Sequence, residues 1–204
     1  HLIGEHIDYH GGFVFPAAIQ LGTYGVVSKR EDRVYYFYSK QFPSKVPVQV
    51  DLQQMTFDAS FGWVNYMKGV LDVCLKKGIY FPFGLNIYVD SDLPEASGLS
   101  SSASIEMLMA WILKQIYQLP YTRTELALIA QEAERNYLGV QSGIMDQLSI
   151  ALGKKDHALF MNTSTLKVTY HPLDIKPYRC VIMNTNYQRT LHDSKYNERV
   201  KETF

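Results

Sequence analysis

The chain has 204 residues, 47% of them hydrophobic, and its 20 lysines and arginines balance its 20 aspartates and glutamates. This length and apolar content can supply the core of one substantial domain. The even charge argues against nucleic-acid binders and membrane-surface proteins, which usually carry a basic excess.

Two further features indicate the compartment. The cysteines, Cys74 and Cys180, are far apart and match no metal-ligand spacing. A reducing cytoplasm is therefore expected rather than a disulfide framework. The longest apolar segment, IEMLMAWIL, is too short to span a bilayer and contains Glu106, and no signal peptide is visible.

The first half of the chain predicts strands followed by a helix. Residues 12–50 hold two β-rich runs, TYGVVSKR and RVYYFYSK, which turn residues separate. Residues 57–77 carry apolar side chains at helical spacing, and Gly78 is the expected C-terminal stop. The segment GLNIYVDSDLP then alternates like a half-buried strand.

The second half predicts two longer helices and then shorter elements. SASIEMLMAWILKQIYQL is apolar nearly all round and should be deeply buried. TRTELALIAQEAERNYLG opens with Thr122 and Glu125 in capping-box spacing and closes at Gly139. Strand-like runs recur near 157–171 and 179–185, and HDSKYNERVKETF resembles a helix. Because no regular βαβ rhythm appears, we expect one α+β domain.

The loop in LPEASGLSSSASIEMLMAWIL is the strongest local signal. A strand ends in a run of small residues that leads directly into a buried helix. Small residues let the backbone approach a ligand, and the N-terminus of a helix favours an anion. The loop lacks the lysine of a Walker A motif, so it predicts either a phosphate site of another type or a serine-rich turn with an N-cap.

Acidic and imidazole groups crowd the start of the chain, in HLIGEHIDYHGG. They could ligate a metal, hydrogen-bond a polar ligand or decorate a turn. His6 and His10 are four residues apart, but Gly4, Gly11 and Gly12 argue against the helix that would align them.

Two more carboxylates stand out, each with an ordinary structural explanation. Asp146 lies near the start of a short predicted helix, opposite an apolar face, where the helix dipole would stabilise a solvated carboxylate. Glu134 follows Ala130 by one helical turn and borders an apolar stripe. The residues alone leave both roles open.

Four motifs in order carry a family resemblance. LPEASGLSSSASIE resembles the nucleotide-binding motif of the GHMP small-molecule kinases, and GEHIDYHGG resembles the galactokinase motif GEHTDYNGG. GVQSGIMDQ and SKYNER match further galactokinase segments, so the resemblance covers the whole chain. It implies an α+β fold of the GHMP-kinase N-terminal type (ribosomal protein S5 domain 2-like), a mixed sheet packed with helices, with residues 1–204 as the N-terminal portion.

The resemblance also implies an activity. Galactokinases use ATP and Mg²⁺ to phosphorylate α-D-galactose at its C1 hydroxyl, the first committed step of the Leloir route. The expected partners are therefore galactose and ATP, with no nucleic acid and no membrane, and the expected protein is a cytoplasmic monomer.

Residue roles follow from the same motifs. By similarity Asp146 is the catalytic base that faces the C1 hydroxyl. The residues implied for galactose are Glu5, His6, Ile7, Asp8, Gly143 and Tyr196. Those implied for ATP are Ser39, Ala96, Ser97, Gly98, Leu99, Ser100, Ser101 and Ser102. Ser102 and Glu134 are the implied magnesium ligands, which suits an ion that takes one or two protein oxygens plus phosphate and water.

The sequence also departs from the family pattern. Ile7 replaces a threonine, His10 an asparagine, and Glu95 adds a negative charge beside the serine loop. The family has a catalytic arginine before the position of His1 and a second glycine-rich half, so the isolated chain is expected to be nearly inactive. Two rivals remain: a relative acting on N-acetylgalactosamine, and a non-catalytic sugar and ATP sensor.

Overall fold

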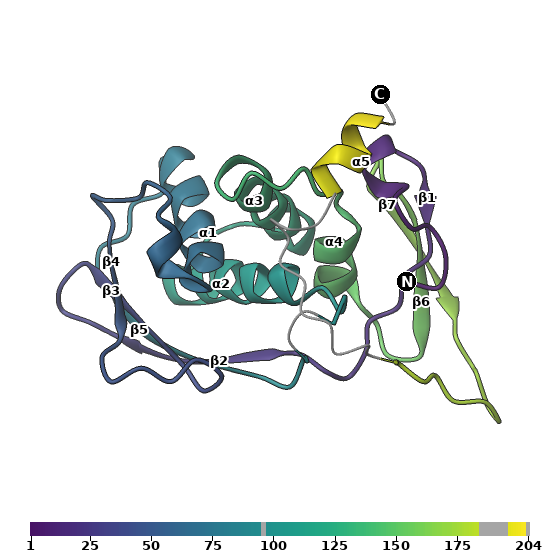
Figure 1. Cartoon of the computed structure of the whole chain (residues 1–204), viewed down its shortest axis with the longest axis horizontal. Coiled ribbons are helices and arrows are strands. Elements are labelled where there is room, and N and C mark those ends of the chain that lie inside the picture. Colours follow the sequence, from purple (N-terminus) through teal and green to yellow (C-terminus); the bar gives the residue numbers. More distant parts are fainter. Residues whose placement is uncertain (95–96, 184–195, 203–204) are drawn as a thin grey trace.

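The computed structural model describes residues 1–94, 97–183 and 196–202. Two separate sheets flank a central group of helices (Figure 1). The four-stranded sheet has the order β2 (Thr23–Lys29), β5 (Leu85–Ser91), β3 (Val34–Ser39) and β4 (Val48–Asp51). The three-stranded sheet has the order β1 (Phe13–Val14), β6 (His157–Asn162) and β7 (Lys167–Pro172).

The four-stranded sheet is mixed, as expected. Strand β5 pairs antiparallel with β2 and parallel with β3, and β4 closes the far edge antiparallel to β3. Leu85, Ile87 and Val89 alternate along β5 and are at most 3% exposed. This strand is therefore half-buried, which confirms the alternation predicted for GLNIYVDSDLP.

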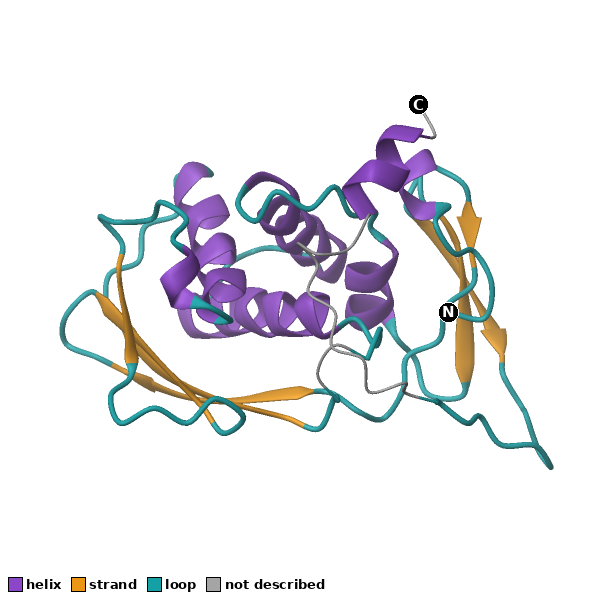
Figure 2. Ribbon diagram, in the orientation of Figure 1, coloured by secondary structure: helices purple, strands orange, loops and turns teal. Residues whose placement is uncertain are grey.

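The helices lie between the sheets (Figure 2). The longer ones are α1 (Val64–Lys76), α2 (Ser101–Tyr117), α3 (Arg123–Asn136) and α4 (Met145–Leu152). Helix α2 packs on β2, and α1, α3 and α4 all pack on α2. Shorter turns are η1 (Asp8–His10) and η2 (Ala59–Phe61), and α5 (Tyr196–Glu202) is the last described element. No helix in the described ranges is both long and apolar enough to cross a membrane.

The predicted helix boundaries are mostly confirmed. Thr122 and Glu125 form the expected capping box, with Glu125 N donating to Thr122 Oγ1 at 3.2 Å. Gly78 and Gly139 follow their helices with positive φ, which suits glycine at a helix end. The helix expected over 57–77 begins only at Val64, because residues 59–61 form the separate turn η2.

One predicted strand is wrong. Residues 179–183 have no regular secondary structure, and 184–185 lie outside the described residues. Val181 and Met183 are 76% and 89% exposed, and among the described strands β7 pairs only with β6. Apolar β-forming residues do not make a strand without a partner strand or a face to bury.

Candidate functional site

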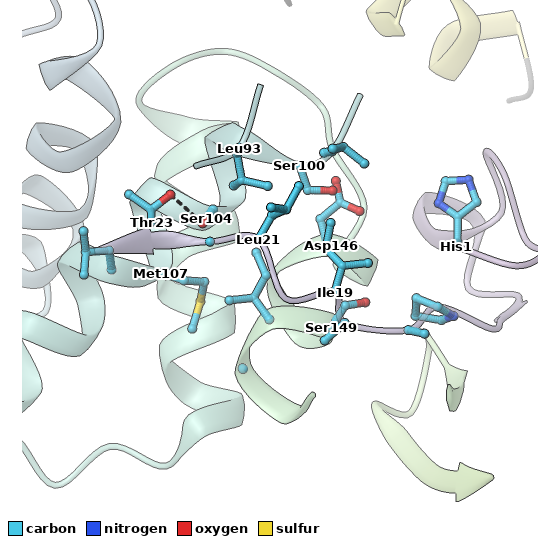
Figure 3. A pocket seen from close by; sticks show the side chains of 18 of the residues that line it. His1, Ile19, Leu21, Thr23, Leu93, Ser100, Ser104, Met107, Asp146 and Ser149 are labelled. Atoms are coloured by element: carbon cyan, nitrogen blue, oxygen red, sulfur yellow. Dashed lines mark hydrogen bonds between the residues drawn. The ribbon is translucent and has the colours of Figure 1, made fainter. Parts of the chain in front are cut away.

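Asp146 lies where two neighbouring cavities meet. A cavity of about 150 Å³ and a larger one of about 490 Å³ share Asp146, Ser100, Gly98 and His1 in their walls. The close view of the larger cavity shows Ser100 and Asp146 facing each other from different elements (Figure 3). The side chains of Ser100 and Asp146 therefore line the same space.

The larger cavity is mostly apolar. Leu21, Leu93 and Met107 project into it, and its polar part includes Thr23 and Ser104, whose hydroxyls are 2.8 Å apart (Figure 3). Since these two hydroxyls bond each other, they anchor β2 to α2 and do not present a free polar pair. The smaller cavity holds the acidic and imidazole groups.

The opening motif GEHIDYHGG folds as a tight turn against helix α4. Gly4, Gly11 and even His6 have positive φ, and Asp8 begins the short helix η1. The Asp8 carboxylate reaches across to α4, where its Oδ2 accepts a hydrogen bond from Met145 N at 3.3 Å. The turn is therefore joined to the helix that carries Asp146.

Two other sugar candidates complete one wall of the smaller cavity. Tyr196 hydrogen-bonds the backbone of Gly143, and its ring centroid lies 5.4 Å from that of His6. His6 Nδ1 lies 2.9 Å from the Tyr9 hydroxyl. Helix α5 is held in place because Asn197 bonds the backbone of both Gly139 and Gln141. Segments from both ends of the described chain thus meet at residues 139–143.

Glu5 and Ile7 differ in their placement. Glu5 lines the smaller cavity and pairs with His1. Ile7 is 40% exposed and lines neither cavity. Ile7 therefore packs within the turn, against Gly12, and does not face the ligand space.

The serine loop wraps the N-terminus of α2. Gly98 and Ser100 have φ of 73° and 57°, so the backbone turns sharply before the helix. Ser97 Oγ donates to Pro94 O at 2.7 Å, and Ser100 makes no side-chain cap to the helix. The hydroxyl of Ser100 instead hydrogen-bonds Asp146. The N-terminal N–H groups of α2 are thus not capped by Ser100, as an anion site requires.

Glu134 is far more buried than a boundary glutamate, at 4% exposed. Its Oε2 accepts hydrogen bonds from Ser142 Oγ at 2.6 Å and from Gln147 Nε2 at 2.9 Å. The Ser102 hydroxyl bonds the same carboxyl group. Burial raises the pKa of Glu134, and the Ser142 hydroxyl opposes that rise.

Ser102 and Glu134 fit a magnesium ion in their chemistry. Both are hard oxygen donors, they touch each other, and both line the smaller cavity with Asp146. Mg²⁺ uses one or two protein oxygens and completes its shell with phosphate and water. No group of three or more His, Cys, Asp or Glu side chains in the described ranges could hold a metal alone.

Burial also perturbs the two aspartates. It raises the pKa of Asp146, and the Ser100 hydroxyl lowers it in part. Burial likewise raises the pKa of Asp8, the Met145 N–H lowers it, and the nearby Asp146 charge raises it further. Two like charges that face one cavity, with raised pKa values, are typical of a site that handles protons.

Not every candidate joins this site. Ser39 lines neither cavity, and its Oγ accepts from Gln41 N at 3.1 Å at the end of β3. Leu99 lines only the larger cavity, Ser101 lines neither, and Ala96 lies outside the described residues. Ser39 and Ser101 are therefore not brought together with Asp146.

Sequence reasoning missed four residues of the site. His1, Ser142 and Gln147 line the smaller cavity, and Glu106 is a buried partner of Gln147. Three of them belong to the quoted motifs GVQSGIMDQ and SSSASIE, so the motifs contained the signal. Their side-chain directions, which depend on how three helices pack, were the missing information.

Comparisons with known proteins match this geometry. A family model for the N-terminal domain of GHMP kinases matches residues 65–154, and one for the galactokinase galactose-binding signature matches residues 1–29. Galactokinases of Staphylococcus carnosus and Streptococcus suis are each 46% identical to the chain over 202 residues. These matches cover 99% of the chain but 52% of each relative, so the chain spans about half the length of the curated relatives it matches.

Solved structures give the same picture. Lactococcus lactis galactokinase complexed with galactose superposes with a TM-score of 0.93 at 42% identity, over 99% of this chain and 52% of that one. Methanococcus jannaschii mevalonate kinase has a TM-score of 0.68 at 19% identity, over 85% of this chain and 52% of that one. The second likeness shows a shared fold alone.

Proposed function

Because residues 65–154 match the N-terminal domain of GHMP kinases and the chain is 46% identical to galactokinases, we propose that its protein transfers the γ-phosphoryl group of ATP to the C1 hydroxyl of α-D-galactose. The observation that carries this proposal is the position of Asp146. Its carboxylate lines the cavity to which the galactose-binding signature contributes Glu5, His6 and Asp8, and it hydrogen-bonds Ser100 of the serine loop.

Asp146 would act as general base. Phosphoryl transfer goes through a loose transition state in most analyses, so positioning and charge neutralisation carry most of the catalysis. Asp146 would orient the sugar hydroxyl and accept its proton as the new P–O bond forms. Burial raises the pKa of Asp146, which makes its carboxylate a stronger base than an exposed one.

The sugar would lie in the smaller cavity. Asp8, Glu5 and His6 offer acceptors and donors around a ring of hydroxyls, and Tyr196 lines the same cavity beside His6 and Gly143. A cavity of about 150 Å³ suits a monosaccharide, one side of which would face the adjoining phosphate donor. Galactose is the sugar held by the similar Lactococcus lactis protein.

The phosphates of ATP would lie at the N-terminus of α2, beside residues 97–102. Ser102 and Glu134 would hold Mg²⁺, which when bound neutralises charge on the phosphates. In the described part of the smaller cavity no lysine or arginine side chain is present. We therefore propose that the isolated 204 residues bind galactose but turn over slowly, because the transferring group needs a further cation.

The protein's setting is also part of the proposal. Cys74 is buried and Cys180 exposed, and both are free thiols, which suits a reducing cytoplasm. We propose a monomer that needs no nucleic acid and no membrane.

The test is galactose-dependent ADP release by the full-length protein, with the product identified as the 1-phosphate by ³¹P NMR. Asp146→Asn run alongside should bind galactose without turnover. N-acetylgalactosamine as the alternative acceptor separates the near rival. Galactose binding without turnover by the unaltered protein would refute the kinase and favour a sensor.

A further inference from the structure

A buried polar cluster joins the wall of the smaller cavity to the interior, and two of its members, Glu106 and Gln147, have no role in the proposed reaction. Glu106 of α2, Glu134 of α3 and Gln147 of α4 are 0%, 4% and 1% exposed. Each comes from a different helix, so the cluster ties together the three helices that carry the serine loop, the proposed metal ligand and the base.

The amide of Gln147 bridges the two carboxyl groups. Its Nε2 donates to Glu134 Oε2 at 2.9 Å and, more weakly, to Glu106 Oε2 at 3.5 Å. An amide nitrogen has two N–H donors, which can serve both acceptors at once. If the Gln147 amide were rotated by about 180°, its oxygen would face two carboxyl oxygens. The two flanking acceptors therefore fix the orientation of the amide.

Glu106 is the anchor of this arrangement. It carries no cation against it in the described structure, and burial raises the pKa of its carboxyl group well above the ordinary value, with the nearby Glu134 raising it further. Two atoms of the pair, Glu106 Oε1 and Gln147 Oε1, have no hydrogen-bond partner within the described residues. A neutral carboxylic acid would supply one donor to a pair that otherwise shows two orphan acceptors.

Glu134 gains a fixed direction from these contacts. The bonds from Gln147 and Ser142 both end on Oε2, which leaves acceptor capacity on the carboxyl group for a ligand in the cavity. Asp146 and Gln147 are consecutive on α4, so their side chains point about 100° apart. Helix α4 thus carries the proposed base, Asp146, on one side and hydrogen-bonds the proposed metal ligand, Glu134, through Gln147 on another.

We propose that Gln147 is a positioning residue that holds Glu134 in place for the metal–nucleotide complex, and that Glu106 is the buried anchor that orients Gln147. This inference rests on the proposed function only through the role of Glu134 toward Mg²⁺. Ligand-orienting partners of this kind typically change metal affinity or activity by about 10- to 100-fold when removed.

The experiment measures nucleotide affinity in the full-length protein by isothermal titration calorimetry with a non-hydrolysable ATP analogue, once with Mg²⁺ and once with EDTA. Gln147→Met keeps the volume and removes the donors. We expect its affinity for the magnesium–nucleotide complex to fall at least tenfold. Its affinity for the metal-free nucleotide and for galactose should stay within about threefold of the wild type.

Matched variants separate positioning from folding. Asn65→Leu is the control, because Asn65 is another buried amide, 3% exposed, whose Nδ2 donates to Asp58 O at 2.8 Å and not to a member of the cluster. Glu106→Gln keeps an acceptor for Gln147 and should stay within threefold of the wild type, whereas Glu106→Met should weaken the magnesium–nucleotide complex at least fivefold. If Gln147→Met does not fold, the affinity of Glu106→Met for the magnesium–nucleotide complex tests the positioning role instead.

Two results would overturn the inference. The first is that Gln147→Met loses no more affinity for the magnesium–nucleotide complex than Asn65→Leu does. If Gln147→Met does not fold, the same comparison is made with Glu106→Met. The other is an equal loss with Mg²⁺ and with EDTA. These affinities need no turnover, so they decide the role of Gln147 even where galactose is not phosphorylated, and a failure of the kinase assay is recognised separately.

Discussion

The carboxylate of Asp8 occupies the space that a side chain at residue 143 would need. A β-carbon on Gly143 would overlap both carboxylate oxygens of Asp8. The glycine in QSGIMD is thus required by a close approach between two segments 135 positions apart, and not by a positive φ. This approach also lets Asp8 reach Met145 N on helix α4.

The first prediction concerns that contact. Gly143→Ala should displace Asp8 and weaken galactose binding by at least tenfold in the full-length protein, because Asp8 can no longer sit against α4. Overpacking of this kind typically lowers the free energy of unfolding by about 1–3 kcal/mol. Calorimetric titration with galactose, together with urea unfolding, measures both effects.

Gly22→Ala is the matched control. Gly22 has no positive φ, and a β-carbon there meets only the Tyr24 hydroxyl, at 3.9 Å. It should bind galactose like the wild type. Unchanged galactose affinity in Gly143→Ala would mean that Asp8 does not contact the sugar.

The second prediction separates chemistry from binding at Asp146. Asp146→Asn keeps the size of the side chain but removes the base, so kcat should fall by about 10²- to 10⁴-fold while galactose affinity changes little. The melting temperature of the ligand-free variant should rise, because a carboxyl group with a pKa raised by burial is replaced by a neutral amide. ADP release and a thermal melt test the two parts, and a stable variant with wild-type kcat would exclude Asp146 as the base.

The third prediction is a pH dependence of stability without metal or nucleotide. Four carboxyl groups of the site have a pKa above the ordinary value because burial penalises their charged form: Asp8, Glu106, Glu134 and Asp146. The folded state binds these protons more tightly than the unfolded state. Stability from these groups is therefore present at low pH and is lost as the pH rises through their folded pKa values.

Exposed carboxylates act in the opposite sense, but at lower pH. Their pKa values are lowered mainly by hydrogen bonds, so their contribution is lost only as the pH falls below about 4. They are Asp32, Asp58, Asp90 and Glu125. Urea unfolding in EDTA should thus show the free energy of unfolding increasing from pH 8 to pH 5, by up to about 1.4 kcal/mol per pH unit for each proton. Asp8→Asn should flatten this slope, and an unchanged slope would contradict the prediction.

Local patterns predicted most of the elements because the responsible interactions are local. The capping box of Thr122 and Glu125 lies within four residues, and the alternation along β5 follows directly from the pleat of a strand. The strand prediction for residues 179–183 was wrong for the opposite reason. Their strand propensity depends on a partner strand, which the sequence of that segment does not contain.

The candidate site was predicted in part. Motif resemblance assigned Asp8, Asp146 and Glu134 to one site, and all three line the smaller cavity, but local reasoning alone interpreted Glu134 as a boundary residue. Its burial depends on α3 packing against both α2 and α4. Gln147 was missed for the same reason, since a polar residue beside Asp146 has no local feature that marks it as buried.

The last prediction concerns the core beneath α2, where two tyrosines form a directed chain. Tyr117 Oη donates to Phe83 O at 2.6 Å, and the Tyr35 and Tyr117 hydroxyls are 2.6 Å apart. Since the single proton of Tyr117 goes to Phe83 O, the Tyr35 hydroxyl must be the donor to Tyr117 Oη. Tyr35 is fully buried, and burial is the largest cause of the rise in the pKa of its hydroxyl, so this hydroxyl stays protonated.

The direction of the chain makes the two deletions unequal. Tyr117→Phe leaves both the Tyr35 hydroxyl and the Phe83 carbonyl without a partner, and should lower the free energy of unfolding by about 1–3 kcal/mol. Tyr35→Phe removes a donor while Tyr117 keeps Phe83 O, and should lower it by about 0.5–1.5 kcal/mol. Urea unfolding of both variants and of the double variant measures the difference. A larger loss in Tyr35→Phe than in Tyr117→Phe would mean that the chain runs the other way.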